Sequence, residues 1–311
     1  MDRLIAVVGP TGSGKSELAL HLADECRGEI VNCDSLQLYR YLDIGTAKVP
    51  PSGRRGIPHH LLDVLDPDQV FTAGEYAFAA RQVLGEIAGR ERLPIVVGGT
   101  GFYLRALLEG LFPGPRRDER LRARLTLREQ RHPGWLHLVL TRFDPASAAK
   151  IHAADVQKAI RAVEVLLLTR RPLSSWFGEG RDPLEGFRVF KLGLDPPRQA
   201  LYDRLDARSE RMFAGGLIEE IERVLSLGFP EGSKALEAHG YKQGLQVLRG
   251  ELTPEAALDS AKLNTRRYAK RQWTWFRRDP EITWLNGFGD DPCVQEEAVT
   301  GVREFLAREG R

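Results

Sequence analysis

The sequence predicts an α/β fold built on a doubly wound parallel sheet. Three short apolar runs have the composition of strands that are buried on both faces. They cover residues 3–9, 28–34 and 93–99. Helical spacing covers residues 15–26, and Thr72 with Glu75 forms the capping-box pattern of a second helix that runs to about Gly89. This alternation of strands and helices is typical of a parallel sheet, whose ligands bind beyond the carboxyl ends of the strands.

The composition changes at residues 113–115, where two prolines flank a glycine. Residues 116–131 contain seven arginines, and helical spacing continues to about residue 173. A strand pattern returns at residues 187–195, followed by further helices and a mixed segment after residue 279. We therefore expect a helical insertion in the core. The predicted boundaries are 1–113 and 187–311 for the core and 114–186 for the insertion.

Bulk properties exclude several classes of protein. The 45 Lys and Arg residues nearly balance 43 Asp and Glu residues, so a nucleic-acid partner must be argued from local clusters of charge. The three cysteines form no C-x-x-C pattern, which argues against a disulfide framework or a zinc site. The first apolar run is too short for a signal peptide, and no run is long enough to span a membrane. We expect a cytoplasmic protein without a membrane anchor.

A phosphate-binding loop follows the first predicted strand. Its pattern is G-x-x-x-x-G-K-S, and a helix follows it, as a P-loop requires. The loop comprises Gly9, Pro10, Thr11, Gly12, Ser13, Gly14, Lys15 and Ser16. Backbone N–H groups in such a loop surround phosphate oxygens, Lys15 adds a positive charge, and the Ser16 hydroxyl suits Mg²⁺. We therefore predict binding of a polyphosphate, although the loop does not specify a nucleotide.

The acidic partner of this loop is not where a nucleotide hydrolase would have it. The third predicted strand ends in glycines and Thr100, without the aspartate of a Walker-B motif. Asp34, at the end of the second strand, is the acidic group nearest the loop in chain order. The residues alone leave it open whether Asp34 accepts a proton, binds a metal or forms a turn.

Six segments occur together in one order and carry a resemblance to a known family. They are GPTGSGKS (9–16), DSLQLYR (34–40), GTAK (45–48), PHHLLD (58–63), GGTGFYLRALLEGL (98–111) and TRRYAKRQWTWFRR (265–278). Together they resemble the tRNA dimethylallyltransferase (tRNA isopentenyltransferase) family of the bacterial type, over residues 4–278. One departure is visible at residues 239–243, which read HGYKQ where the family usually has IGYKE.

The resemblance implies transfer of a dimethylallyl group from dimethylallyl diphosphate to N6 of adenosine 37 in tRNA, with release of diphosphate. It also implies a P-loop NTPase-like core, a helical insertion that clasps the tRNA anticodon arm, and Mg²⁺ as cofactor. No obligate protein partner is evident.

The resemblance assigns catalytic roles to Asp34, Thr100 and Arg208. Asp34 is expected to accept the proton that the adenine amine loses during attack. Thr100 is expected near the reacting centre, although its position also suits a helix N-cap. Arg208 is expected to reach the diphosphate, with pairing to Asp203 or Glu210 as the alternative.

Further residues are predicted to contact tRNA. They comprise polar residues near the second strand, a basic helix of the insertion and two later segments, in which basic and aromatic residues alternate. For any isolated charged helix, the alternative is a solvated surface. The predicted tRNA contacts are Asp34, Ser35, Leu36, Gln37, Thr100, Arg122, Gln157, Lys158, Ala159, Ile160, Arg161, Gly240, Tyr241, Lys242, Arg271 and Gln272.

Two other functions remain compatible with a P-loop: a kinase that uses ATP, and an RNA-binding module that uses a nucleotide only as a switch. A kinase would have no use for the basic insertion and the basic–aromatic segment, whereas the RNA-binding module stays open. The pair His59 and His60 lacks acidic or cysteine partners at metal-binding spacing, so we predict a structural role for both.

Overall fold

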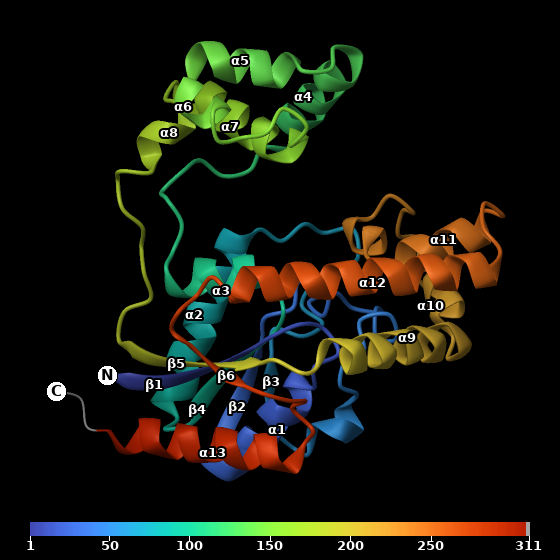
Figure 1. Cartoon of the computed structure of the whole chain (residues 1–311). Coiled ribbons are helices and arrows are strands. Elements are labelled where there is room, and N and C mark those ends of the chain that lie inside the picture. The colour runs from blue at the N-terminus through green and yellow to red at the C-terminus, as the bar shows by residue number, and fades with distance from the viewer. Residues whose placement is uncertain (309–311) are drawn as a thin grey trace. The chain divides into compact units, whose positions relative to one another are not determined.

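The computed structural model describes residues 1–308 and contains a six-stranded sheet. Its strands are β1 (Asp2–Val8), β2 (Gly28–Asn32), β3 (His59–His60), β4 (Leu93–Val97), β5 (Phe187–Leu194) and β6 (Ile282–Leu285). Their order is β3-β2-β4-β1-β5-β6, and all neighbouring pairs are parallel. The predicted α/β class and parallel sheet are confirmed (Figure 1).

Two strands were not predicted, because each is too short to show a pattern in the sequence. β3 contains only the histidine pair, and β6 lies in the segment we expected to be mixed. The histidines have structural partners: His59 Nδ1 is 2.8 Å from the Ile57 carbonyl oxygen, and His60 Nε2 is 2.7 Å from Glu29 Oε2. Among residues 1–308, no cluster of three or more His, Cys, Asp or Glu could hold a metal.

The helices of the core begin and end at local signals in the sequence. They are α1 (Lys15–Cys26), α2 (Ala73–Gly89), α3 (Gly101–Leu108), α9 (Arg198–Ala214), α10 (Leu217–Ser226), α11 (Tyr241–Leu248), α12 (Pro254–Phe276) and α13 (Pro292–Ala307), with 3₁₀ turns η1 (Pro51–Arg54) and η2 (Lys234–Glu237). The capping box of α2 forms as predicted: Thr72 Oγ1 accepts from Glu75 N and Glu75 Oε2 accepts from Thr72 N. No helix in the described part of the chain is long and apolar enough to cross a membrane.

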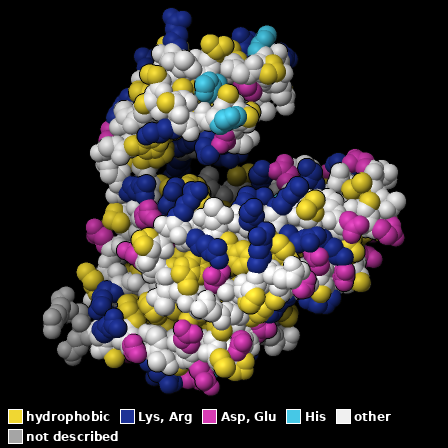
Figure 2. Space-filling view, in the orientation of Figure 1, with side chains coloured by type: hydrophobic (Ala, Val, Ile, Leu, Met, Phe, Trp, Pro, Cys, Tyr) yellow, Lys and Arg dark blue, Asp and Glu magenta, His cyan; other side chains and the backbone are white. Residues whose placement is uncertain are grey.

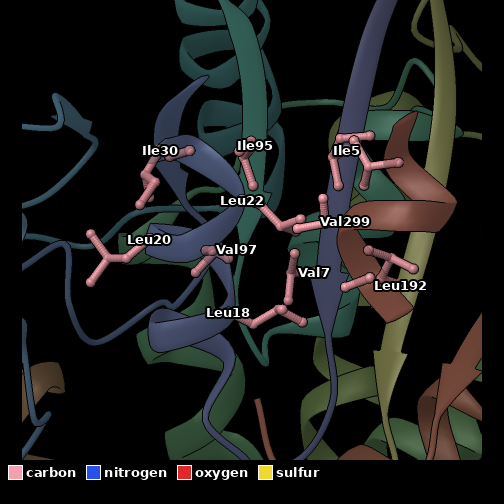
Figure 3. Packing of buried hydrophobic residues seen from close by; sticks show 14 of the residues in the cluster. Ile5, Val7, Leu18, Leu20, Leu22, Ile30, Ile95, Val97, Leu192 and Val299 are labelled. Carbon is pink, nitrogen blue, oxygen red and sulfur yellow. The ribbon is translucent and has the colours of Figure 1, made fainter. Parts of the chain in front are cut away.

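The main hydrophobic core lies between the sheet and helices α1 and α13. Figure 3 shows Leu18 and Leu22 of α1 and Val299 of α13 beside Ile5 and Val7 of β1. The alternate strand residues Leu4, Ala6 and Val96 are also buried, so both faces of the sheet are covered. Burial on both faces explains why these strands read as continuous apolar runs.

Residues 109–183 form a second compact unit, while residues 1–108 and 184–308 belong to the first. The second unit contains α4 (Glu119–Arg131), α5 (Trp135–Phe143), α6 (Pro145–Ala148), α7 (Val156–Thr169) and α8 (Leu173–Trp176), and no strand. It has its own core, which includes Leu125, Leu140 and Val163. The insertion was predicted at 114–186, so it begins and ends somewhat earlier than expected. Residues 309–311 of the predicted core lie outside the described residues.

Candidate functional site

The phosphate loop lies between β1 and α1, the strand–loop–helix context that the sequence predicted. Gly9, Gly12 and Gly14 have φ values of 140°, 78° and 87°, in the region that favours glycine. A Cβ at Gly12 would lie 2.7 Å from Leu205 Cδ2, so a larger residue would also clash. Lys15 Nζ donates to the Pro10 carbonyl oxygen at 2.7 Å, which folds the ammonium group back over the loop.

The electrostatics of the loop suit an anion. Burial lowers the pKa of Lys15 to about 8, the Asp34 carboxylate opposes this shift, and the Arg208 guanidinium adds to it. Burial also lowers the pKa of Arg208, again against the effect of Asp34. Two desolvated cations therefore share one carboxylate. An arriving anion would restore favourable charge pairing for both.

Asp34 follows β2 and is fixed by local hydrogen bonds. Its backbone N–H donates to Asn32 Oδ1 at 3.0 Å, and its Oδ1 accepts from Leu36 N at 2.9 Å. One carboxylate oxygen thus forms the turn that we considered as an alternative role. The second oxygen, Oδ2, makes no hydrogen bond with any residue from 1 to 308, so it is available to accept a proton.

Thr100 joins the ends of β4 and β2. Its Oγ1 accepts from Ser35 N at 3.1 Å, and its own N–H donates to the Cys33 carbonyl oxygen at 3.2 Å. Close approach here requires glycine, because a Cβ at Gly98 would lie 2.0 Å from that carbonyl oxygen. Thr100 and Asp34 are therefore brought to the same edge of the sheet, as predicted for strand ends.

Arg208 is the arginine of α9 that faces this site. It donates to Thr11 Oγ1 at 3.5 Å and to the Thr46 carbonyl oxygen at 3.4 Å, both weak hydrogen bonds. The suggested carboxylate partners bind elsewhere: Asp203 accepts from Gln199, and Glu210 pairs with Lys262. Arg208 forms no ion pair within the described residues, so its charge remains available for a ligand.

A cavity of about 260 Å³ adjoins these groups, and its lining contains both polar and apolar residues. The polar lining residues include Thr11, Asp34, Ser35, Thr46 and Arg208. The apolar lining residues include Leu205, Met212, Phe213, Leu217 and Ala261. Tyr268 also lines the cavity; burial and the Asp34 charge raise its pKa, so the phenol stays protonated. The arrangement suits a ligand with an anionic head and a short apolar tail.

A buried carboxylate that sequence reasoning missed holds one wall of this cavity. Glu220 accepts from the backbone N–H groups of Asp43 and Ile44 at 2.9 and 2.8 Å. Its other oxygen accepts from Tyr241 Oη at 2.6 Å. The Tyr241 side chain is fully buried and supports this wall, while the tRNA contact at Tyr241 stays a prediction. Only its position within the GYK segment pointed to importance, and that signal could not separate support from contact.

Gln272, another predicted tRNA contact, is used within the fold. Its side chain is buried, accepts from Thr11 N at 2.8 Å and donates to the Gly99 carbonyl oxygen at 2.9 Å. It therefore links α12 to the phosphate loop and to the end of β4, and its side chain is not free to contact tRNA. On the same helix, Arg271 is exposed and remains a predicted tRNA contact.

The insertion also differs from the prediction. Ala159 and Ile160 lie in its hydrophobic core, so their side chains cannot contact RNA there. Arg122 and Arg161 both pair with the buried Glu164, at 2.8 and 2.7 Å, which uses their charges within the fold. The tRNA contacts expected at these two arginines stay predictions.

The remaining predicted tRNA contacts have various surroundings. Gln37 donates to the Thr46 carbonyl oxygen at 3.2 Å, Leu36 is half-buried, and Gly240 is buried at the start of α11. The exposed members are Gln157, Lys158 and Lys242. Lys158 also pairs with Asp155 at 2.5 Å, an exposed pair of the kind that contributes little to stability.

The IPP transferase family model matches residues 37–279 of this chain. The chain belongs to this family. Members of the IPP transferase family align with nearly the whole length of this chain. The tRNA dimethylallyltransferase of Solibacter usitatus is 60% identical, with 98% of this chain and 99% of that protein covered. The tRNA dimethylallyltransferase of Koribacter versatilis is 54% identical, covering 95% and 96%.

Solved structures of the family have the same fold. A tRNA isopentenylpyrophosphate transferase from Bacillus halodurans aligns with a TM-score of 0.72 and 35% identity, covering 99% of this chain and 96% of that chain. A eukaryotic dimethylallyltransferase, solved in crystallographic snapshots acting on tRNA, aligns with a TM-score of 0.86 and 28% identity, covering 100% and 81%. The P-loop NTPase-like fold and the family resemblance predicted from the sequence are confirmed.

Proposed function

We propose that this enzyme transfers a dimethylallyl group from dimethylallyl diphosphate to N6 of adenosine 37 in the tRNA anticodon arm. Membership of the IPP transferase family supports the reaction class. The cavity carries the proposal further, because its lining combines the Arg208 guanidinium and Thr11 of the phosphate loop with apolar side chains. A short isoprenoid diphosphate has that combination of charge and apolar surface. We also propose that the enzyme acts in the cytoplasm.

The leaving group is stabilised by the phosphate loop. As the C1–O bond of the allylic substrate breaks, its electron pair stays on the diphosphate oxygen. Backbone N–H groups of the loop, Lys15 and Arg208 oppose the charge that develops there. Preorganised electrostatic stabilisation of this kind is usually the largest contribution to catalysis.

Mg²⁺ fits this site as a partner of the substrate. Among the described residues no cluster of acidic or histidine ligands exists, so the protein does not form a complete cage by itself. Mg²⁺ commonly keeps several waters and binds through few protein groups and substrate phosphates. Ser16, in the first turn of α1, would supply a hydroxyl ligand. When bound, the ion would neutralise part of the diphosphate charge.

Asp34 acts as the proton acceptor. The N6 amine of adenine is weakly nucleophilic, and it becomes acidic as its lone pair forms the bond to C1. Asp34 Oδ2 is available to take that proton, while Oδ1 holds the carboxylate in place through Leu36 N. General base catalysis of this kind contributes about 10²- to 10⁴-fold.

The adenine must leave the stack of the anticodon loop to reach this cavity, which costs a few kcal/mol. Exposed basic residues of the core, including Lys242 and Arg271, offer electrostatic attraction to the RNA backbone. Figure 2 shows Lys and Arg side chains on the exposed face formed by α12. We further propose that the helical insertion clasps the anticodon arm.

One assay tests the proposal against its alternatives. Protein, Mg²⁺ and unmodified tRNA are incubated with dimethylallyl diphosphate or with ATP, and the digested nucleosides are weighed. A C5 mass gain on adenosine supports dimethylallyl transfer. ADP with a phosphorylated product would support a kinase, and no product at all would support a binding module.

The Asp34→Asn variant tests the proton acceptor. We expect a single-turnover rate reduced by about 10²- to 10⁴-fold with unchanged tRNA affinity. Asp203→Asn is the matched control, because Asp203 is exposed on α9 and bonds only Gln199 among the described groups. An unchanged rate in Asp34→Asn would reject the assignment.

A further inference from the structure

Three side chains that the mechanism does not use form a cluster at the surface of the core. Phe102 and Arg105 belong to α3, and Trp275 belongs to α12. The Phe102 and Trp275 rings meet edge to face, with centroids 6.5 Å apart. The Arg105 guanidinium lies over both rings, 5.3 Å and 5.2 Å from their centroids. We refer to Phe102, Arg105 and Trp275 as the aromatic platform.

The aromatic platform is rigidly connected to the candidate site. α3 begins immediately after Thr100, and Gly101 allows the indole to pack there, because a Cβ at that position would lie 2.2 Å from Trp275 Cδ1. On α12, Gln272 precedes Trp275 by three residues and bonds both the phosphate loop and the Gly99 carbonyl oxygen. Both sides of the platform are thus fixed to groups around the reacting centre.

The cluster is more exposed than packing alone requires. The exposed fractions are 45% for Phe102 and 37% for Trp275, and large exposed aromatic groups beside basic residues mark binding surfaces. Arg105 has no ion pair among residues 1–308, so its charge is not used within the fold. Arg271 and Arg278 of the same α12 segment are also exposed. Exposed aromatic rings beside guanidinium groups that form no ion pair among the described residues suit a nucleobase and its phosphate.

We propose that the aromatic platform stacks one unpaired base next to the adenosine that enters the site. This inference rests on the proposed function. When the target adenine leaves the loop, its neighbour loses a stacking partner, and an exposed ring of the protein can replace it. Sequence-tolerant stacking is expected, since every base has a π face. The platform would therefore hold the loop open without reading its sequence.

Binding of an anticodon stem-loop RNA tests the proposal. We expect Trp275→Ala and Phe102→Ala each to raise the Kd by about 5- to 100-fold, the range of one base–aromatic stack. Phe78→Ala is the matched control, because Phe78 is a 68% exposed aromatic residue of α2 outside the platform. Thermal unfolding of each variant checks its fold, and two separate variants keep the test valid if one is unstable.

A coupling experiment distinguishes base stacking on Trp275 from a loss of RNA affinity that does not depend on any one base. The RNA carries an abasic nucleotide on one side or the other of the target adenosine, and its Kd is measured with wild type and with Trp275→Ala. We expect one of the two abasic RNAs to bind wild type more weakly than the intact RNA does. With Trp275→Ala, the same abasic RNA should bind almost as well as the intact RNA. Additive losses, or unchanged wild-type binding of both abasic RNAs, would overturn the proposal.

The proposal for the aromatic platform and the proposed reaction can fail independently of each other. If wild type forms the C5 adduct on adenosine but the coupling is absent, the aromatic platform is rejected and the reaction stands. If no adduct forms while the coupling is present, the platform binds a base and the reaction is rejected.

Discussion

Glu164→Gln should destabilise the helical insertion much more than an ordinary surface substitution. The Glu164 side chain is fully buried in α7, where its carboxylate accepts from Arg122, Arg161 and the Asp118 backbone N–H. Burial raises the pKa of this carboxyl, but these donors outweigh burial and hold the pKa at about 2. The carboxylate is therefore charged in the folded protein and compensates for two largely buried guanidinium groups.

The expected magnitude follows from this pKa. A carboxyl whose pKa falls from 4.5 to about 2 on folding contributes about 3 kcal/mol to stability at neutral pH. Removing one partner of a buried ion pair typically costs about 3–5 kcal/mol, because the remaining charges stay desolvated. Because the folded pKa is depressed, this contribution is present above pH 4.5 and is lost as the pH falls towards 2.

Hydrogen exchange measured by mass spectrometry on the whole protein can locate this effect. Peptides from α4 and α7 should exchange faster in Glu164→Gln at neutral pH, with opening free energies lower by about 3–5 kcal/mol. Glu119→Gln is the matched control, because Glu119 lies on α4 of the same unit and likewise pairs with an arginine, Arg117, but its side chain is 57% exposed. That control should change by about 1 kcal/mol or less. Equal effects of the two substitutions would refute the reasoning.

Three further predictions concern the site. The affinity for inorganic diphosphate should fall as the pH rises above about 8, because Lys15 loses its proton there. Calorimetry should show this decline in wild type but not in Lys15→Arg, because arginine stays charged. Gln272→Leu leaves the buried Gly99 carbonyl and the part-buried Thr11 N–H without their partner, so urea unfolding should show a loss of about 1–3 kcal/mol, together with weaker diphosphate binding. Tyr241→Phe removes one hydrogen bond to Glu220 and should cost about 1.5–3 kcal/mol in the same unfolding measurement, whereas an unchanged midpoint would argue against a supporting role.

The sequence determined the features that depend on near neighbours along the chain. The four predicted strands, the capping box at Thr72 and the phosphate loop each follow from the types and spacing of a few consecutive residues. The order of strand, loop and helix then placed Asp34 and Thr100 at the carboxyl edge of the sheet. The family followed from six motifs in one order. The weakest signals were the short strands β3 and β6, which contain too few residues to show a period.

Only the tertiary structure decided which charged side chains are free for a ligand. Arg204 and Arg208 lie on the same helix, yet Arg204 pairs with Asp290 and Arg208 reaches the phosphate loop. Gln272 bonds Thr11, a residue 261 positions away in the chain. The physical reason is that a buried polar group must find its partner in space, and the chain order does not show which segment supplies it. The sequence thus indicated the class of reaction, and only the folded structure showed which residues are available at the site.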